Sequence, residues 1–266
     1  MFGRRKIAAL MAEFLGTGAL TLLILSVQRS TIGVPFFVAA AAGLTITLMT
    51  FGAYRISGAH FNPALTLGLF TARKITISRT LVYIVAQFLG AYLASLLYVY
   101  LVKNHLKDIP SKFEYRILVA EAVGTALLAF GYAAALYQRL TLGLVAAVAG
   151  LAYMIGSIAA SPASLGLINP AVALGVHAFI VKLYLLGPVL GAIVGVQLYN
   201  LLFALPQGVV AGDGVSDASS LQAKMGSDAE VTQTTVTVVK PVRKPRAASA
   251  KAGTAKARAT SKRTPR

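Results

Sequence analysis

The most constraining feature of this chain is a series of apolar blocks separated by short polar hinges. An α-helix of about 20 apolar residues crosses the roughly 30 Å of hydrocarbon in a bilayer. Hydrophobic residues make up 57% of the 266 residues and charged residues only 12%, against about 25% charged in a typical soluble domain. The sequence therefore predicts an all-α, multi-pass membrane protein. We predict six spans, at residues 7–27, 34–54, 79–102, 115–137, 141–160 and 183–205.

Two further apolar segments, 61–72 and 168–180, are too short to span a bilayer, and each carries Asn-Pro-Ala near its start. Irregular backbone at membrane depth persists only where protein buries it or where it lines a watery cavity. We therefore predict two re-entrant half-helices, each preceded by a loop that dips into the protein. The two tripeptides are Asn62, Pro63 and Ala64, and Asn169, Pro170 and Ala171.

The residue order within the tripeptide suits a helix start. Asn is a preferred N-cap, because its side-chain oxygen accepts a hydrogen bond from an N–H of the first turn. Pro fits the first helical position, where a missing N–H costs nothing. A helix start carries about half a positive charge, so two starts that meet near the midplane create a positive, donor-rich spot. We expect the remaining amide hydrogens of both Asn side chains to face the lumen at that spot.

The two halves of the chain repeat each other. The stretches "MAEFLGTGALTL" at 11–22 and "VAEAVGTALLAF" at 119–130 both contain Ala-Glu-x-x-Gly-Thr, and each precedes an Asn-Pro-Ala segment by a similar distance. This pattern predicts a duplication, with repeat one at about 7–102 and repeat two at about 115–205. Because each repeat has an odd number of spans, the second copy is inverted in the membrane, as in many transport proteins.

Each repeat places one carboxylate inside its first span, Glu13 and Glu121, and the predicted spans contain no other. An unpaired charge at membrane depth is expensive, so both residues are functional candidates. Two roles compete. The glutamates relay protons, or they accept hydrogen bonds from the loop that enters each half-helix. Their symmetric placement beside Gly-Thr favours the second role.

These features resemble the aquaporin, or major intrinsic protein, family. The stretches "SGAHFNPALTLG" and "GLINPAVALG" are similar to the two signatures of the family, and Gln87 and Gly187-Pro188 also fit its patterns. The resemblance covers about residues 7–205. It implies an aquaporin-like fold of six tilted helices plus two half-helices. It also implies a homotetramer with one pore per subunit, through which water and small uncharged solutes pass passively.

The resemblance also implies roles for individual residues. Asn62 and Asn169 would orient the permeating molecule at the pore centre, and the two glutamates would brace the loops. The backbone carbonyls of Gly58–Phe61 and Ser164–Ile168 would form the ladder along which that molecule passes. His60 would lie at the pore mouth on the cytoplasmic side.

The outer constriction departs from the family pattern. Members usually have an Arg three residues after the second Asn, and this chain has Val172 there. Offsets from the two Asn residues assign the other constriction positions to Ala42, Ser157 and Gly166. None of the four residues is aromatic or charged. We therefore predict a wide constriction that lacks a fixed positive charge against cations.

The sequence leaves the solute open. By the same resemblance, Ala173, which lies where glycerol-conducting members usually have Asp, favours a water channel, whereas Leu185 favours a glycerol channel. Glycerol, urea, ammonia and hydrogen peroxide therefore stay candidates beside water. The chain has no Cys and no phosphate-binding loop, and its three His form no metal-ligand motif. We expect neither an enzyme nor a cofactor or metal site.

The end of the chain differs in kind from the rest. We predict a channel domain at 1–206 and a basic C-terminal tail at 207–266, whose composition is typical of disorder. The distribution of Lys and Arg favours cytoplasmic termini in a cell-membrane protein surrounded by membrane lipids. The tail is either a solvated extension or a binder of anionic lipid or nucleic acid. An alternative function is therefore a membrane anchor or interaction protein with a vestigial pore.

Overall fold

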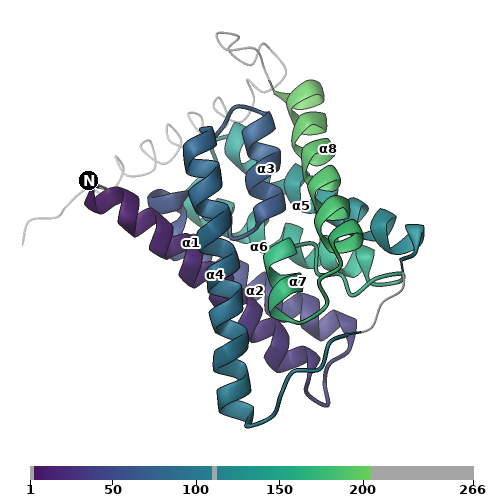
Figure 1. Cartoon of the computed structure of the whole chain (residues 1–266). Coiled ribbons are helices and arrows are strands. Elements are labelled where there is room, and N and C mark those ends of the chain that lie inside the picture. Colours follow the sequence, from purple (N-terminus) through teal and green to yellow (C-terminus); the bar gives the residue numbers. More distant parts are fainter. Residues whose placement is uncertain (1–2, 110–112, 205–266) are drawn as a thin grey trace, which may run out of the picture. The chain divides into compact units, whose positions relative to one another are not determined.

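The computed structural model describes residues 3–109 and 113–204, and regular structure in those residues is helical throughout (Figure 1). The tail predicted at 207–266 lies outside the described residues. The elements are α1 (Arg4–Gln28), α2 (Pro35–Ser57), α3 (Pro63–Thr71), α4 (Ile77–Val102), α5 (Tyr115–Tyr137), α6 (Leu142–Ala160), α7 (Pro170–Gly175), the π-helical turn η1 (Val181–Leu185) and α8 (Leu186–Phe203).

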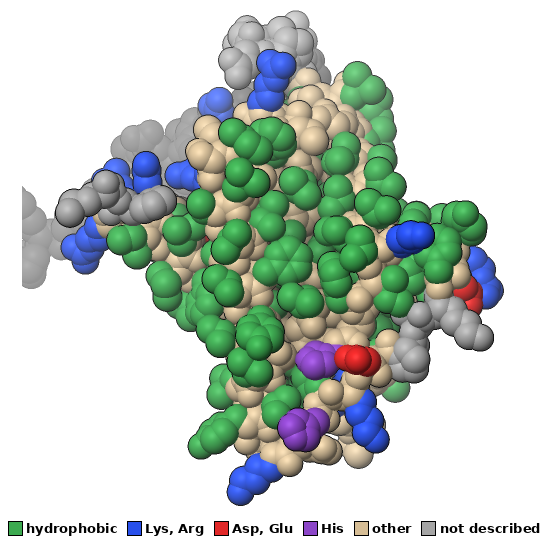
Figure 2. Space-filling view, in the orientation of Figure 1, with side chains coloured by type: hydrophobic (Ala, Val, Ile, Leu, Met, Phe, Trp, Pro, Cys, Tyr) green, Lys and Arg blue, Asp and Glu red, His purple; other side chains and the backbone are tan. Residues whose placement is uncertain are grey.

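Six of these helices are long and apolar enough to cross a membrane, which confirms the predicted fold class. They are α1, α2, α4, α5, α6 and the continuous stretch Val181–Phe203, in which η1 leads into α8. Large apolar side chains on their outer faces are exposed, and Leu44 and Leu48 keep 72% and 71% of their surface. Figure 2 shows a broad apolar face with most of its Lys and Arg at the margins, which suits contact with hydrocarbon.

The two half-helices begin where the tripeptides predict. Asn62 and Asn169 have extended backbone and act as N-caps, and Pro occupies the first helical position in both. The side-chain oxygen of Asn62 accepts a hydrogen bond from the N–H of Ala64 at 2.9 Å. That of Asn169 accepts from the N–H of Ala171 at 3.1 Å. Each bond pairs an N–H that the helix itself leaves without a partner.

The two half-helices also end in the same kind of turn. Arg73 after α3 and His177 after α7 have left-handed backbone, with φ of 57° and 62°. In both turns the N–H of the next residue donates to the carbonyl five residues earlier, at 2.9 and 3.0 Å, which defines a Schellman motif. Because His177, the residue after the C-cap Val176, adopts this left-handed turn, α7 stops at Gly175 and not at the predicted residue 180.

Glycines allow the paired helices of each repeat to approach closely. Gly90 of α4 lies against the carbonyl of Phe14 in α1, and Gly191 of α8 lies against the carbonyl of Ala122 in α5. A Cβ at either glycine would overlap that carbonyl oxygen. The α1–α4 contact of the first half is thus repeated by α5 and α8 in the second half.

The glycine of the repeated Ala-Glu-x-x-Gly-Thr motif makes room for the re-entrant loop. A Cβ on Gly16 would overlap the ring of Phe61. A Cβ on Gly124 would lie 2.8 Å from Cγ2 of Ile168 and would overlap the carbonyl oxygen of Gly156. Phe61 and Ile168 immediately precede the two capping Asn residues. The motif therefore determines how closely each loop approaches the first helix of its repeat.

We expect Gly124→Ala to destabilise the protein, because the added methyl group meets backbone that cannot move aside. Overpacking of this kind costs about 1–3 kcal/mol and lowers the midpoint of thermal unfolding. Gly52→Ala is the matched control, since its Cβ meets nothing within 4 Å. That change should be neutral or slightly stabilising, because Ala favours helix more than Gly does. Thermal unfolding of both variants in detergent measures the difference, and equal midpoints would contradict the close approach.

Candidate functional site

The starts of α3 and α7 are joined by two reciprocal hydrogen bonds. Nδ2 of Asn62 donates to the carbonyl of Ile168 at 2.8 Å, and Nδ2 of Asn169 donates to the carbonyl of Phe61 at 2.9 Å. Both Asn side chains are almost completely buried. Each amide therefore uses one of its two hydrogens to hold the opposite loop. The sequence predicts that the amide hydrogens of both Asn side chains face the lumen. Because one hydrogen of each is bonded to the opposite loop, fewer N–H donors are left for a passing molecule.

The loops before both Asn residues share an unusual backbone. Phe61 and Ile168, one residue before each Asn, have φ of 48° and 44°. Ala59 and Gly166, three residues before each Asn, have φ of 55° and 63°. A left-handed conformation costs a non-glycine residue about 1–3 kcal/mol, so the surrounding structure must hold these loops in place.

Glu13 holds the first loop through both of its carboxylate oxygens. Oε1 accepts hydrogen bonds from Oγ of Ser57 at 2.6 Å and from the N–H of His60 at 3.0 Å. Oε2 accepts from the N–H of Phe61 at 2.7 Å and from Nε2 of Gln87 at 2.8 Å. The carboxylate is fully buried, and these four donors offset the loss of its hydration.

Glu121 makes the corresponding contacts in the second loop. Oε1 accepts from Oγ of Ser164 at 2.8 Å and from the N–H of Leu167 at 3.1 Å. Oε2 accepts from the N–H of Ile168 at 2.7 Å. Both glutamates thus bond the residue that precedes an Asn cap. This geometry has the pattern that loop bracing requires, and the role itself stays a prediction.

The geometry changes what we expect of a glutamine substitution. From the sequence alone, Glu121→Gln would be mild, because an amide oxygen still accepts a hydrogen bond. Each carboxylate oxygen of Glu121 faces a backbone N–H, so either orientation of Gln sets an NH₂ group against a donor. We expect Glu121→Gln to cost about 1–3 kcal/mol and to lower water permeability. Glu114→Gln is the control, because the side chain of that exposed residue pairs with Arg116 at the surface and contacts neither loop in the part of the chain that the structure describes. Similar thermal unfolding and permeability in both variants would contradict loop bracing.

Several carbonyls of the predicted ladder accept hydrogen bonds from the protein itself. The hydroxyl of Tyr132 donates to the carbonyl of Gly58, and that of Tyr153 donates to the carbonyl of Leu167 at 2.7 Å. Neither tyrosine belongs to a sequence motif that would have indicated this contact. A carbonyl oxygen has two lone pairs, so each of these groups keeps one for another donor.

His60 lies between aromatic rings near the end of the molecule that carries the N-terminus. Its ring meets those of Tyr83 and Tyr132 edge-on, with centroids 5.6 and 6.0 Å apart. It borders a cavity of about 410 Å³ that is also lined by Arg55, Lys74 and Arg79. The resemblance predicts the cytoplasmic pore mouth beside His60, and this role of the cavity stays a prediction.

The four predicted constriction residues are all buried. Ser157 and Gly166 are in contact, because Oγ of Ser157 donates to the carbonyl of Gly166 at 2.7 Å. Val172 lies in the first turn of α7 and has no exposed surface, and Ala42 of α2 is 1% exposed. Of the four residues assigned from the sequence, Ser157 and Gly166 are joined by a hydrogen bond. A wide outer constriction stays a prediction.

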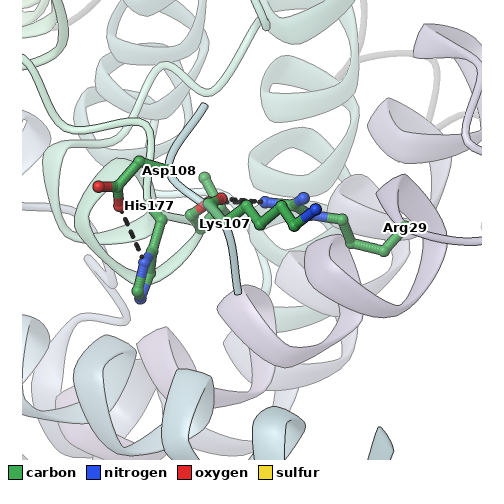
Figure 3. A network of polar contacts seen from close by, with 5 residues as sticks. Arg29, Lys107, Asp108 and His177 are labelled. Atoms are coloured by element: carbon green, nitrogen blue, oxygen red, sulfur yellow. Dashed lines mark hydrogen bonds and ion pairs between the residues drawn. The ribbon is translucent and has the colours of Figure 1, made fainter. Parts of the chain in front are cut away.

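A cation that sequence analysis missed lies at the far end of α7 (Figure 3). Nη2 of Arg29 donates to the carbonyl of Val176 at 3.4 Å and to the carbonyl of Lys107 at 3.2 Å. Val176 is the C-cap of α7, where the helix dipole is negative and favours a cation. Beside it, Nδ1 of His177 lies 3.2 Å from Oδ1 of Asp108. These contacts tie the α4–α5 connection to the end of the half-helix.

An inverted pair of half-helices held inside six spans defines a class of membrane channel. Residues 4–199 match the family described as Major intrinsic protein, and the chain belongs to this family of channels.

Among its relatives, Aquaporin NIP1-1 of Zea mays is 32% identical over 200 residues, which cover 71% of this chain and 70% of that protein. Aquaporin Z of Rhodopseudomonas palustris is 28% identical, over 76% of this chain and 96% of that protein. The solved structure of the aquaglyceroporin from Plasmodium falciparum shares the fold, with a TM-score of 0.63 at 21% identity. The match covers 74% of this chain and 96% of the Plasmodium falciparum chain.

Proposed function

We propose that the chain is a passive channel for water and small uncharged solutes, whose pore passes between the starts of α3 and α7. The observation that carries this proposal is the meeting of two capped half-helix starts through Asn62 and Asn169. In this proposal, the second amide hydrogen of each Asn orients a permeating oxygen atom. Relatives named as aquaporins, and a structural neighbour named as an aquaglyceroporin, support water and a polyol as solutes. Urea, ammonia and hydrogen peroxide belong to the same class of small uncharged molecules.

The same arrangement opposes the passage of cations. Each half-helix start carries about half a positive charge, and both lie at the proposed pore centre. A cation would also have to give up its hydration shell there. Exclusion of cations in this proposal does not depend on an Arg at the position of Val172. Arg29 does place a cation near this position, because it bonds the carbonyl of Val176, one helical turn beyond Val172.

We further propose that Ala42, Ser157, Gly166 and Val172 form the outer constriction. All four are small or aliphatic, so solutes larger than water meet neither an aromatic ring nor a charge at these positions. Asn62, Asn169 and the two half-helix starts then carry most of the selection.

The remaining features of the proposal concern the setting of the channel. We propose a homotetramer in the cell membrane, with both termini cytoplasmic and with membrane lipids around it. Basic residues on the N-terminal face, such as Lys6, Arg73 and Arg139, support this orientation. The basic tail at 207–266 would bind anionic lipid or nucleic acid on the same side.

The first test measures water flux by stopped-flow light scattering of proteoliposomes in a sucrose gradient. We expect the parent to shrink faster than empty vesicles and Asn62→Leu to approach the empty-vesicle rate. This variant removes the helix cap, worth about 0.5–2 kcal/mol, together with the bond to Ile168, so thermal unfolding must show that it still folds. Asn104→Leu, at an exposed position, is the control that should behave like the parent. A parent no faster than empty vesicles would favour the alternative, a membrane anchor with a vestigial pore.

The second test addresses the constriction and compares Val172→Leu with Val172→Arg. Leu adds volume alone, whereas Arg adds volume and charge. We expect both variants to reduce glycerol and urea flux more than water flux. For Arg, the reduction for the larger solutes should reach roughly tenfold, which corresponds to about 1.4 kcal/mol of barrier. A parent that passes water but neither glycerol nor urea would contradict a wide constriction.

A further inference from the structure

A cationic cavity lies beside the first turns of α1 and α4. It has a volume of about 850 Å³, and its wall includes Lys6 of α1, Arg73 and Lys74 of the α3–α4 connection, and Arg79 of α4. None of the described residues that line it is acidic. Four cations around one cavity produce a strongly positive potential, which attracts an anionic group.

An apolar groove continues from this cavity between α1 and α4. The groove has a volume of about 410 Å³ and shares Leu10 and Val82 with the cationic cavity. It follows α4 from Leu81 to Leu89, a length of about 12 Å at 1.5 Å rise per residue. In Figure 2 the surface over α4 is largely apolar, which suits contact with lipid chains.

Neighbouring aromatic rings orient two of the cations. The guanidinium of Arg79 lies 5.8 Å from the ring centre of Tyr83, and Nζ of Lys74 lies 4.0 Å from that of Tyr137. The two ion pairs within the described residues involve none of Arg73, Lys74 and Arg79. Lys74 and Arg79 are thus partly ordered, and all three side chains are available to an anion from outside the protein.

We propose that this cavity and groove form a binding site for one anionic phospholipid. Its phosphate group lies among Lys6, Arg73 and Arg79, and one acyl chain occupies the groove between α1 and α4. The anionic headgroup of such a lipid matches the cationic cavity, and its apolar chain matches the groove that continues from that cavity. The cationic part of this site adjoins the cavity beside His60, because Lys74, Ile75 and Arg79 line both. The apolar groove lies between α1 and α4, away from the half-helix starts, so the lipid proposal does not rest on the channel function.

Two other occupants fit less well. The tail segment 240–266 contains Lys and Arg but no acidic residue, so its charge has the same sign as that of the cavity. A second copy of this chain would cover the apolar groove but would leave the cations without an anionic partner. An anionic lipid satisfies both parts at once.

Native mass spectrometry of the delipidated, full-length protein in detergent tests the proposal. We titrate the protein with dioleoyl phosphatidylglycerol and, separately, with dioleoyl phosphatidylcholine, and expect tighter binding of the anionic lipid. Arg73→Gln should weaken the tightest phosphatidylglycerol site by roughly fivefold, the effect of about one cation near an anionic headgroup. The tail is present in every variant, so its own lipid binding cancels in the comparison.

Arg139→Gln is the matched control. Arg139 is also exposed, follows a helix that ends on the same face, and has left-handed backbone with φ of 52°, but it does not line the cavity. We expect this variant to bind lipid like the parent. Equal weakening by both substitutions would mean unspecific attraction by the basic face, and equal affinity for the two lipids would also overturn the proposal.

Two further measurements separate the parts of the site. Ala86→Phe fills the groove and should weaken phosphatidylglycerol binding while leaving the cations in place. If this variant instead changes the oligomeric state and leaves lipid binding unchanged, the groove is an interface between copies. Inorganic phosphate at the same concentration as the lipid should not compete with it. If phosphate competes equally well, the cavity binds small anions and not a lipid.

Discussion

Two buried carboxylates hold the re-entrant loops in a backbone conformation that most side chains disfavour. Glu13 and Glu121 accept hydrogen bonds from the N–H groups of Phe61 and Ile168, the residues that adopt left-handed φ immediately before each Asn. Charge-assisted bonds of this kind are roughly twice as strong as neutral ones, so they offset the backbone strain. If the two carboxylates have the bracing role predicted for them, the position of each Asn, the start of each half-helix and the bonds between the two loops depend on this support.

Much of this arrangement was readable from the sequence, because it rests on local chemistry. The lengths of the apolar blocks predict the six spans, and the Asn-Pro pairs predict the two half-helix starts. The end of α7 was missed, because nothing local indicates that His177 adopts a left-handed turn. Arg29 was missed for another reason. Its partner Val176 lies 147 residues away, and only the packing of α1 against α7 brings the two together.

The two halves of the inverted repeat have similar backbone structure but differ in the side chains around their loops and half-helix ends. Glu13 has a fourth donor, Gln87, whereas the bonds to Glu121 come from its own loop. The end of the molecule near His60 is bordered by tyrosine rings and cations. At the other end, Arg29 and the His177–Asp108 pair tie down a connection between helices. A molecule that crosses this protein would therefore meet different groups on entering from the two sides.

The reciprocal bonds between the Asn side chains and the opposite loops bear on how the chain is made. The carbonyl that receives Nδ2 of Asn62 belongs to Ile168, which the ribosome adds more than a hundred residues later, since the two positions are 106 residues apart. Until the second half is present, the first loop cannot make this bond, and at membrane depth one amide and part of its polar backbone would lack partners, a costly state in hydrocarbon. Maturation of the first half is thus linked to insertion of the second, and neither half reaches its final form alone.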